Sequence, residues 1–334
     1  MTRVWLLVAL VFETENDAAA HGMGEVLAWS QEALAIARRH GDPVATCAAL
    51  NARVYLSLGP DLADEREGLA AELLAVAQQH DLLGYEALAH WLLFLCASAR
   101  TDLTEAIRRA DLAVERSTSG QLAALVQVVE VYRAVLAVLA GRVDDAASEY
   151  RRLARRMAET GMSSAAEAAL VFELVLAFAR GDTSGLTDVM VGLHDVHPDA
   201  MNEALVLCLL DAGRIEEARA RWSTRSPVRR NYYWLARMAL HAHAAVRLGD
   251  VDACATTYEE LLPWTGRVAG IDSGSVAFGM VDDALALLAD ATGRTDDAAR
   301  HRRDALSVGA AVTAQLATAG LIPRSPSPSG GSPA

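Results

Sequence analysis

Lysine is absent from this 334-residue sequence, and every strongly basic side chain in it is an arginine. The chain therefore has no lysine that could form a Schiff base and none for a Walker-type phosphate loop. Aromatic residues make up only 5% of the chain, and runs that alternate β-branched or aromatic residues with polar ones are scarce. Because strands are built from such runs, the sequence predicts no β-sheet.

Cysteine and histidine do not gather in a metal-binding pattern. The four cysteines are far apart and lie in apolar stretches, which is typical of buried, reduced thiols in a cytoplasmic protein: Cys47, Cys96, Cys208 and Cys254. His241 and His243 would point to opposite sides of a helix, while His194 and His197 lack a third ligand. The sequence thus predicts no metal site and no cofactor, and no GxSxG motif indicates a catalytic nucleophile.

An excess of acidic side chains gives the chain a formal net charge of -13. A field of this sign repels phosphate, so we expect no direct contact with nucleic acid or with an anionic membrane. The apolar run at residues 4–12 is shorter than the roughly 20 residues that cross a bilayer. A signal-peptide core is an alternative, but the acidic residues that follow within 13–17 favour the first helix of a cytoplasmic protein.

What the chain does contain is a repeat with four strong and two weaker copies. Each copy has a helix-ending position followed by one or two acidic residues, and the six anchors are Thr101, Gly141, Gly181, Gly213, Gly249 and Gly293. The steps between anchors are 40, 40, 32, 36 and 44 residues, near the roughly 34 residues of tetratricopeptide (TPR) helical pairs. Tyr150, Trp222 and Tyr258 stand nine residues after three of the anchors.

The repeat has a direct physical interpretation. Each glycine would end a helix in the left-handed conformation, and the acids after it would open the next helix at the positive end of its dipole. Ala146, Tyr150 and Leu153 then share one helix face, which is covered only when neighbouring hairpins stack. The sequence predicts an all-α fold over residues 1–320, a right-handed α-solenoid of TPR-like hairpins, and a disordered Pro/Ser/Gly tail at 321–334.

The glycine-rich stretch LLPWTGRVAGIDSGSVAFG, residues 261–279, is the first candidate for a binding site. It lacks the lysine of a phosphate loop and follows an amphipathic helix rather than a strand, so neither a Walker nor a dinucleotide-binding motif fits. We expect a long connection between two helices, in which Asp272 or Ser273 caps the second helix. The alternative is contact with a small ligand or a partner through Arg267, Asp272, Ser273 and Ser275.

The stretch RRNYYW, residues 229–234, is the second candidate. Two arginines beside three aromatic rings are typical of an anion-binding or partner-binding hot spot: Arg229, Arg230, Tyr232, Tyr233 and Trp234. The alternative is a helix start whose rings fill the core while its arginines face water. Three consecutive rings cannot share one helix face, so we expect at least one of them near the surface.

The order of these motifs resembles a known family. ALVFETEND, LAGRVDDAASEYRRLARRM and YEELLPWTGRVAGIDSGSVAFGMVDDALALLA, in that order, are similar to the C-terminal helical-repeat region of large actinobacterial transcriptional regulators, the SARP-type and ATP-binding LuxR-type proteins. The resemblance implies a sensor or protein-interaction arm, with DNA-binding and ATPase modules elsewhere in the chain. This sequence has no basic winged-helix segment and no Walker A motif, so neither activity maps onto its residues.

We therefore expect a non-catalytic scaffold in transcriptional regulation, which binds a partner protein such as a regulator module or another transcription component, or senses a small-molecule effector. A protein of a different class stays open: a small-molecule-binding protein or enzyme that uses the concave face of the solenoid through Arg229, Arg230, Tyr233, Arg267 and Asp272. Because the regulator modules are missing, the sequence also fits one part of a split regulator or a truncated remnant.

Overall fold

The computed structural model describes residues 1–16, 23–117, 123–162, 165–196 and 198–322. All regular elements in these ranges are helices, and one antiparallel bridge joins Val268 to Met280. The prediction of an all-α fold without a sheet is therefore confirmed for the described residues. Positions 323–334 of the expected tail lie outside them. None of the helices in the described ranges is long and apolar enough to cross a membrane.

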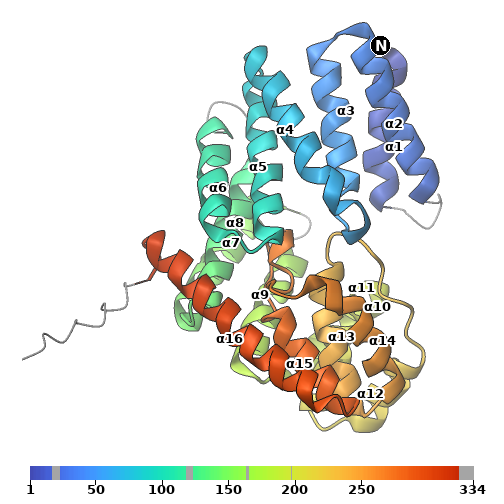
Figure 1. The fold of residues 1–334 in the computed structure, drawn as a ribbon, viewed down its shortest axis with the longest axis vertical. Helices are drawn as coiled ribbons and strands as arrows, with labels where there is room; N and C mark the ends of the chain where they lie inside the picture. Colours follow the sequence, from blue (N-terminus) through green and yellow to red (C-terminus); the bar gives the residue numbers. More distant parts are fainter. Residues whose placement is uncertain (17–22, 118–122, 163–164, 197, 323–334) are drawn as a thin grey trace, which may run out of the picture.

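Sixteen α-helices follow one another along the described chain (Figure 1): α1 Thr2–Asn16, α2 Met23–His40, α3 Pro43–Leu56, α4 Ala63–Gln79, α5 Leu83–Ala99, α6 Leu103–Ser117, α7 Ala123–Leu139, α8 Val143–Glu159, α9 Ala165–Arg180, α10 Thr187–Val196, α11 Pro198–Asp211, α12 Ile215–Ser223, α13 Trp234–Leu248, α14 Val251–Leu261, α15 Val281–Ala291 and α16 Thr295–Thr318. Short 3-10 helices lie between some of them: η1 Pro60–Leu62, η2 Ser184–Leu186, η3 Leu262–Trp264 and η4 Ile271–Ser273. Most helices pack against the next, and α1, α3, α11 and α13 also pack against the next but one. Stacked helical hairpins cover one another's apolar faces in this way.

The repeat anchors end helices as the sequence predicts. The five anchor glycines have φ between +73° and +77°, which is the left-handed conformation. Acidic residues occupy the first turns of the helices that follow four of them, α8, α12, α14 and α16. Ala146, Tyr150 and Leu153 are buried together on one face of α8. The repeat pattern therefore corresponds to real helix ends and helix contacts.

Thr101 occupies the one anchor that is not a glycine, and it adopts φ of +60°. A β-branched side chain is strained in this conformation, so the surroundings must hold it there. Its Oγ1 accepts a hydrogen bond from the amide of Val268 at 3.3 Å. Its carbonyl accepts one from Nε2 of Gln315 at 3.1 Å. Both partners come from the C-terminal part of the chain.

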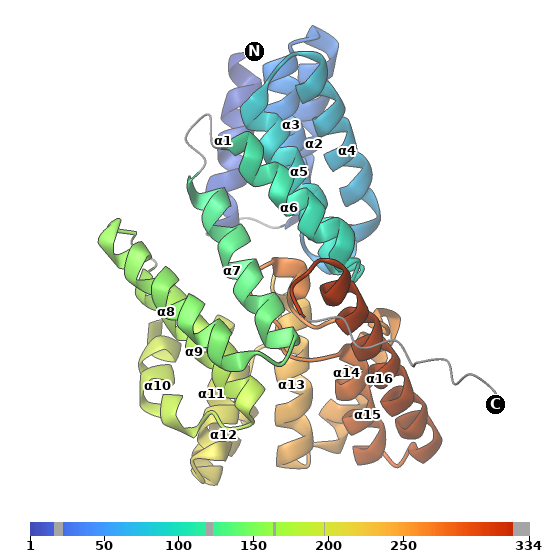
Figure 2. The same cartoon turned by 90° about the vertical axis from the view of Figure 1, so that its left-hand side faces the viewer.

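The C-terminal end of the described chain folds back onto the middle of the chain. In Figures 1 and 2, α16 (red) extends from its neighbour α15 to α6 and α7, and it is in contact with both. Gln315 on α16 caps α6, because its Oε1 accepts hydrogen bonds from the amides of Leu103 and Thr104 at 2.7 and 3.3 Å. η4 packs against α5. We call these contacts the closure. The sequence analysis did not predict it, and the right-handed solenoid geometry stays a prediction.

Candidate functional site

The two stretches singled out in the sequence lie against each other at the closure. Tyr232 donates a hydrogen bond from Oη to the carbonyl of Ser273. Oη of Tyr233 lies 3.4 Å from Oγ of Ser275, which is 3.0 Å from Oγ of Ser273. Tyr233 is 42% exposed, whereas Trp234 is 1% exposed. The expectation that at least one of the three rings lies near the surface is confirmed.

Two of the three candidate arginines bind partners inside the protein. Arg230 donates from Nε to Oδ1 of Asp61 at 2.6 Å, and Arg267 donates to the carbonyl of Ala99 at 3.0 Å. Each of the two guanidinium groups also stacks on a tryptophan ring. Arg229 is exposed. The structure thus engages Arg230 and Arg267 in contacts within the protein, and their binding of a ligand or partner stays a prediction.

The glycine-rich stretch does connect two helices, but the prediction that Asp272 or Ser273 caps the second helix is wrong. α15 begins only at Val281, eight residues beyond Ser273. Before α15, the loop folds back on itself, so that the amide of Ala269 donates a hydrogen bond to the carbonyl of Gly279 at 2.9 Å. Ser273 instead binds a carbonyl within its own turn. The stretch is thus a packed loop rather than a simple connection.

Asp272 lies at the base of the closure. Its Oδ1 is buried without a hydrogen-bond partner, beside a cavity of about 10 Å³ that it lines together with Arg66 and Arg267. A volume of this size is roughly the space of one water molecule. Burial raises the pKa of Asp272 to about 6, because the attraction of Arg66 and Arg267 offsets only part of the cost of desolvating the carboxylate. This carboxyl group therefore titrates well above an ordinary aspartate.

The raised pKa predicts a pH-dependent contribution of Asp272 to stability. The folded state binds the proton more tightly than the unfolded state, so the stabilisation is present at pH 4 and is lost as the pH rises through about 6. As the pH rises from 4 to 7, the wild type should therefore lose about 2 kcal/mol of unfolding free energy relative to the Asp272→Asn variant, whose side chain does not titrate. Urea unfolding across this range measures it. For the exposed control Asp296→Asn, the stability difference from the wild type should not change with pH. The same result for Asp272→Asn would contradict the assignment.

A larger cleft lies beside the closure, between the segment 225–230 and helices α13 and α14. It has a volume of about 590 Å³, within the range of small-molecule sites. Its lining is Arg225, Ser226, Pro227, Val228, Arg230, Met238, His241, Asp250, Asp252, Ala253, Thr256, Thr257 and Glu260. Among the residues that the sequence predicted for a site, Arg230 alone belongs to this lining.

The charges in the cleft are not balanced. Arg225 and Arg230 are each paired with a carboxylate of the protein, at 3.3 and 2.6 Å. Asp252, Thr256 and Glu260 are spaced by four along α14, which places them on one helix face. In the described part of the chain, neither Asp252 nor Glu260 has an ion-pair partner. The cleft therefore offers uncompensated negative charge on its α14 side.

Behind the cleft, a buried ion pair supports the α13 wall. Glu203 is 1% exposed, and its Oε2 accepts hydrogen bonds from Nε and Nη2 of Arg237 at 3.0 and 2.9 Å. His241, which lines the cleft, places Nδ1 3.8 Å from the other carboxylate oxygen. Burial acts to raise the pKa of Glu203, but His241 and Arg237 outweigh it, so the pKa lies below its usual value.

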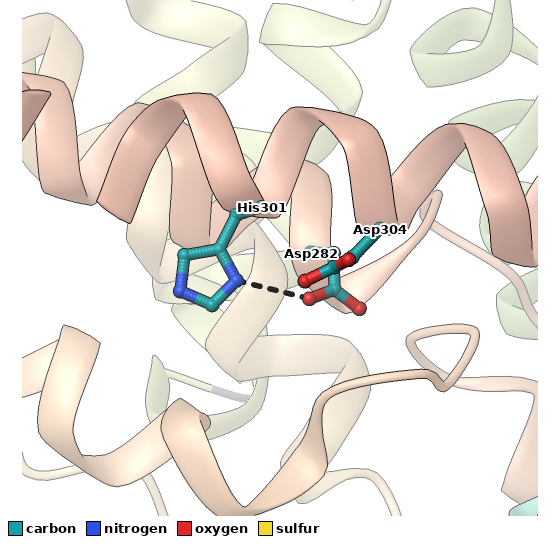
Figure 3. Close-up of side chains that lie close together, drawn as sticks. All are labelled: Asp282, His301 and Asp304. Carbon is teal, nitrogen blue, oxygen red and sulfur yellow. Dashed lines mark hydrogen bonds and ion pairs between the residues drawn. The ribbon is translucent and has the colours of Figure 1, made fainter. Parts of the chain in front are cut away.

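A second polar cluster lies between α15 and α16 (Figure 3). Asp282, His301 and Asp304 each offer one possible metal ligand, and these three atoms lie within 4.8 Å of one another. Asp282 is 0% and His301 2% exposed. The sequence analysis missed this group because Asp282 reads as an ordinary acid in the first turn of a helix. The available signal was the spacing of His301 and Asp304, three residues apart on one face of α16.

The four cysteines are free and buried, as expected. Burial raises the pKa of the Cys96 thiol to about 11, with nearby Arg66 offsetting part of the rise. A thiol with such a pKa is largely protonated near neutral pH. Cys96 is therefore a poor nucleophile in the folded protein.

Comparison with known proteins does not assign the chain to a family. No model of a known protein family matches it, and a search of curated proteins finds no significant relative. The resemblance to actinobacterial regulators stays a prediction, and the candidate sites must be argued from their own geometry.

Proposed function

We propose that the protein is a non-catalytic helical-repeat module that senses a small-molecule effector, as part of transcriptional regulation. The cleft of about 590 Å³ between the segment 225–230 and helices α13 and α14 supports this proposal, because it is large enough for a metabolite and is preformed. The regulatory context rests on the resemblance of the repeat motifs to SARP-type and LuxR-type regulators.

The unpaired acidic residues of the cleft indicate the chemical class of the effector. Its arginines are already paired with carboxylates of the protein, whereas Asp252 and Glu260 are not. A ligand amine can supply charge-assisted hydrogen bonds to these two acids. The net charge of -13 also attracts cations to the surface. The effector is therefore a small molecule that carries at least one amino group.

Thermal unfolding in the presence of spermidine, arginine and glucosamine tests the cleft. We expect at least one of them to raise the midpoint temperature saturably, since a ligand that binds only the folded state stabilises it. The double variant Asp252→Asn/Glu260→Gln should weaken this binding at least tenfold. Asp296→Asn, which removes an exposed carboxylate outside the cleft, should leave it within twofold and so controls for general attraction of amines to an acidic protein.

If no amine stabilises the chain, or if amines stabilise both variants equally, the alternative is that the protein binds a partner protein. Helix α1 offers the surface for it. This helix buries Val4 and Val11 yet exposes Trp5 and Leu6, at 43% and 61%. An exposed tryptophan beside an exposed leucine is typical of protein-interaction surfaces.

A further inference from the structure

We propose that Asp282, His301 and Asp304 bind one divalent transition-metal ion, such as Zn²⁺ or Mn²⁺, between α15 and α16. The site is separate from the cleft and does not depend on the proposed function. It combines one imidazole nitrogen with two carboxylate oxygens, a donor set that suits these ions.

The three ligand atoms are close enough for a single ion. Metal–ligand distances of about 2.0–2.2 Å place neighbouring ligand atoms roughly 3–3.5 Å apart. Nδ1 of His301 already lies 3.0 Å from Oδ1 of Asp282, and no pair among the three atoms exceeds 4.8 Å. Figure 3 shows the carboxylate of Asp304 beside that of Asp282. A small movement of Asp304 completes the site.

Groups outside the site hold two of the ligands in place. The amide of Gly266 donates to Oδ2 of Asp282 at 2.7 Å, which leaves Oδ1 for the ion. Nε2 of His301 lies 3.1 Å from Oη of Tyr258. With a metal on Nδ1, Nε2 carries the ring proton and donates a hydrogen bond to Oη of Tyr258. Metal-ligating histidines and carboxylates usually have such outer hydrogen bonds, which orient them.

The charges of the cluster call for a cation. Asp282 is fully buried, and a second carboxylate, that of Asp304, lies beside it. Of the nearby arginines on α16, Arg300 pairs with Asp297 and also places Nη2 3.4 Å from Nε2 of His301, while Arg302 pairs with another acid. Neither arginine forms an ion pair with Asp282 or Asp304 within the described residues. Within the described residues, Asp304 has no hydrogen bond or ion pair. Two adjacent carboxylates repel each other unless positive charge lies between them, and a divalent ion supplies it.

The position of Asp304 also gives the ion a route from solvent. Asp304 is less buried than Asp282 and His301. Three protein ligands leave at least one coordination position for water or for another ligand, as in metal sites that are open rather than closed. The structure thus predicts an exchangeable ion rather than one that is locked in at folding.

Calorimetric titration of the chelator-treated full chain with ZnCl₂ and MnCl₂ tests the site, with Co²⁺ absorption as a spectroscopic readout. We expect saturable one-to-one binding by the wild type. Asp304→Asn should weaken it at least tenfold, because it removes one charged ligand while leaving the fold without a lost contact. Asp296→Asn removes the same charge from the first turn of the same helix and should change the affinity less than twofold.

Three outcomes would overturn the proposal. One is the absence of saturable binding, which would mean that Tyr258, His301 and Asp282 form only a buried hydrogen-bonded chain. Another is equal affinity of Asp304→Asn and the wild type. The third is a sulfur-to-cobalt charge-transfer band, which would assign the bound ion to a cysteine.

Discussion

Replacing Gly274 with alanine is expected to lower the free energy of unfolding by about 3 kcal/mol. Gly274 has φ of +69°, and a Cβ atom built there would lie 2.9 Å from Cζ of Phe94 and 3.2 Å from Cδ2 of Leu95. Both side chains are fully buried, and the Phe94 ring packs edge-on against Tyr132 with centroids 4.6 Å apart. Because the ring cannot move without opening that contact, overpacking adds to the backbone strain.

Gly249→Ala is the matched control for this substitution. Gly249 has a similar φ of +74°, and nothing lies within 4 Å of a Cβ atom built on it. We expect a loss of about 1 kcal/mol from the backbone conformation alone. Urea unfolding followed by circular dichroism gives both values. Equal losses in the two variants would show that the glycine-rich loop does not pack rigidly against α5.

The helices and their ends were predictable from the sequence because their causes are local. Gly141 ends a helix wherever the hairpin lies in the fold, since only the conformation of its own backbone matters. Tyr150 is buried because a ring nine residues after the anchor falls on the face that meets the neighbouring helix. Spacing and residue type therefore sufficed for the all-α fold, and no distant contact had to be known.

The closure could not be read from the sequence because its contacts join residues far apart. Thr101 looks like a weak copy of the repeat, yet it takes the left-handed conformation because Val268 and Gln315 hold it. Gln315 itself is an unremarkable polar residue in a helical pattern. No periodicity connects positions separated by 214 residues along the chain. Only the folded arrangement shows that they meet.

The candidate sites were predictable in part. Sequence reasoning singled out Arg230, Tyr232 and Asp272, but it gave no reason to expect that Arg230 would bind Asp61 or that Tyr232 would bind the carbonyl of Ser273. Glu260 in the cleft reads as a solvated residue on a helix face. Asp282 reads as an acid placed for the helix dipole. Glu260 and Asp282 both fit an ordinary helix by residue type. Only their neighbours in the folded structure mark them as candidate site residues.

Replacing Arg237 with methionine is expected to lower the free energy of unfolding by about 3–5 kcal/mol at pH 7.5. Glu203, 1% exposed, would lose two hydrogen bonds from Arg237 and keep only His241 beside it. Most of the loss is the cost of an uncompensated buried charge rather than the net value of the ion pair. The Glu203→Leu/Arg237→Met double variant should therefore recover most of the stability, since no buried charge remains. Arg219→Met, in an exposed pair with Glu216, should cost less than about 1 kcal/mol.

The pH dependence separates the charge effect from simple loss of packing. In the wild type the pKa of Glu203 is lowered, so its contribution to stability is present above the pKa of the unfolded chain and is lost as the pH falls through the folded value. Without Arg237, burial dominates and raises this pKa, so mild acid protonates Glu203 in the folded variant. The deficit of Arg237→Met relative to the wild type should then shrink between pH 7.5 and pH 4.5 in chemical unfolding. A deficit that does not change with pH, together with a double variant as unstable as the single one, would assign the loss to packing of the arginine stem.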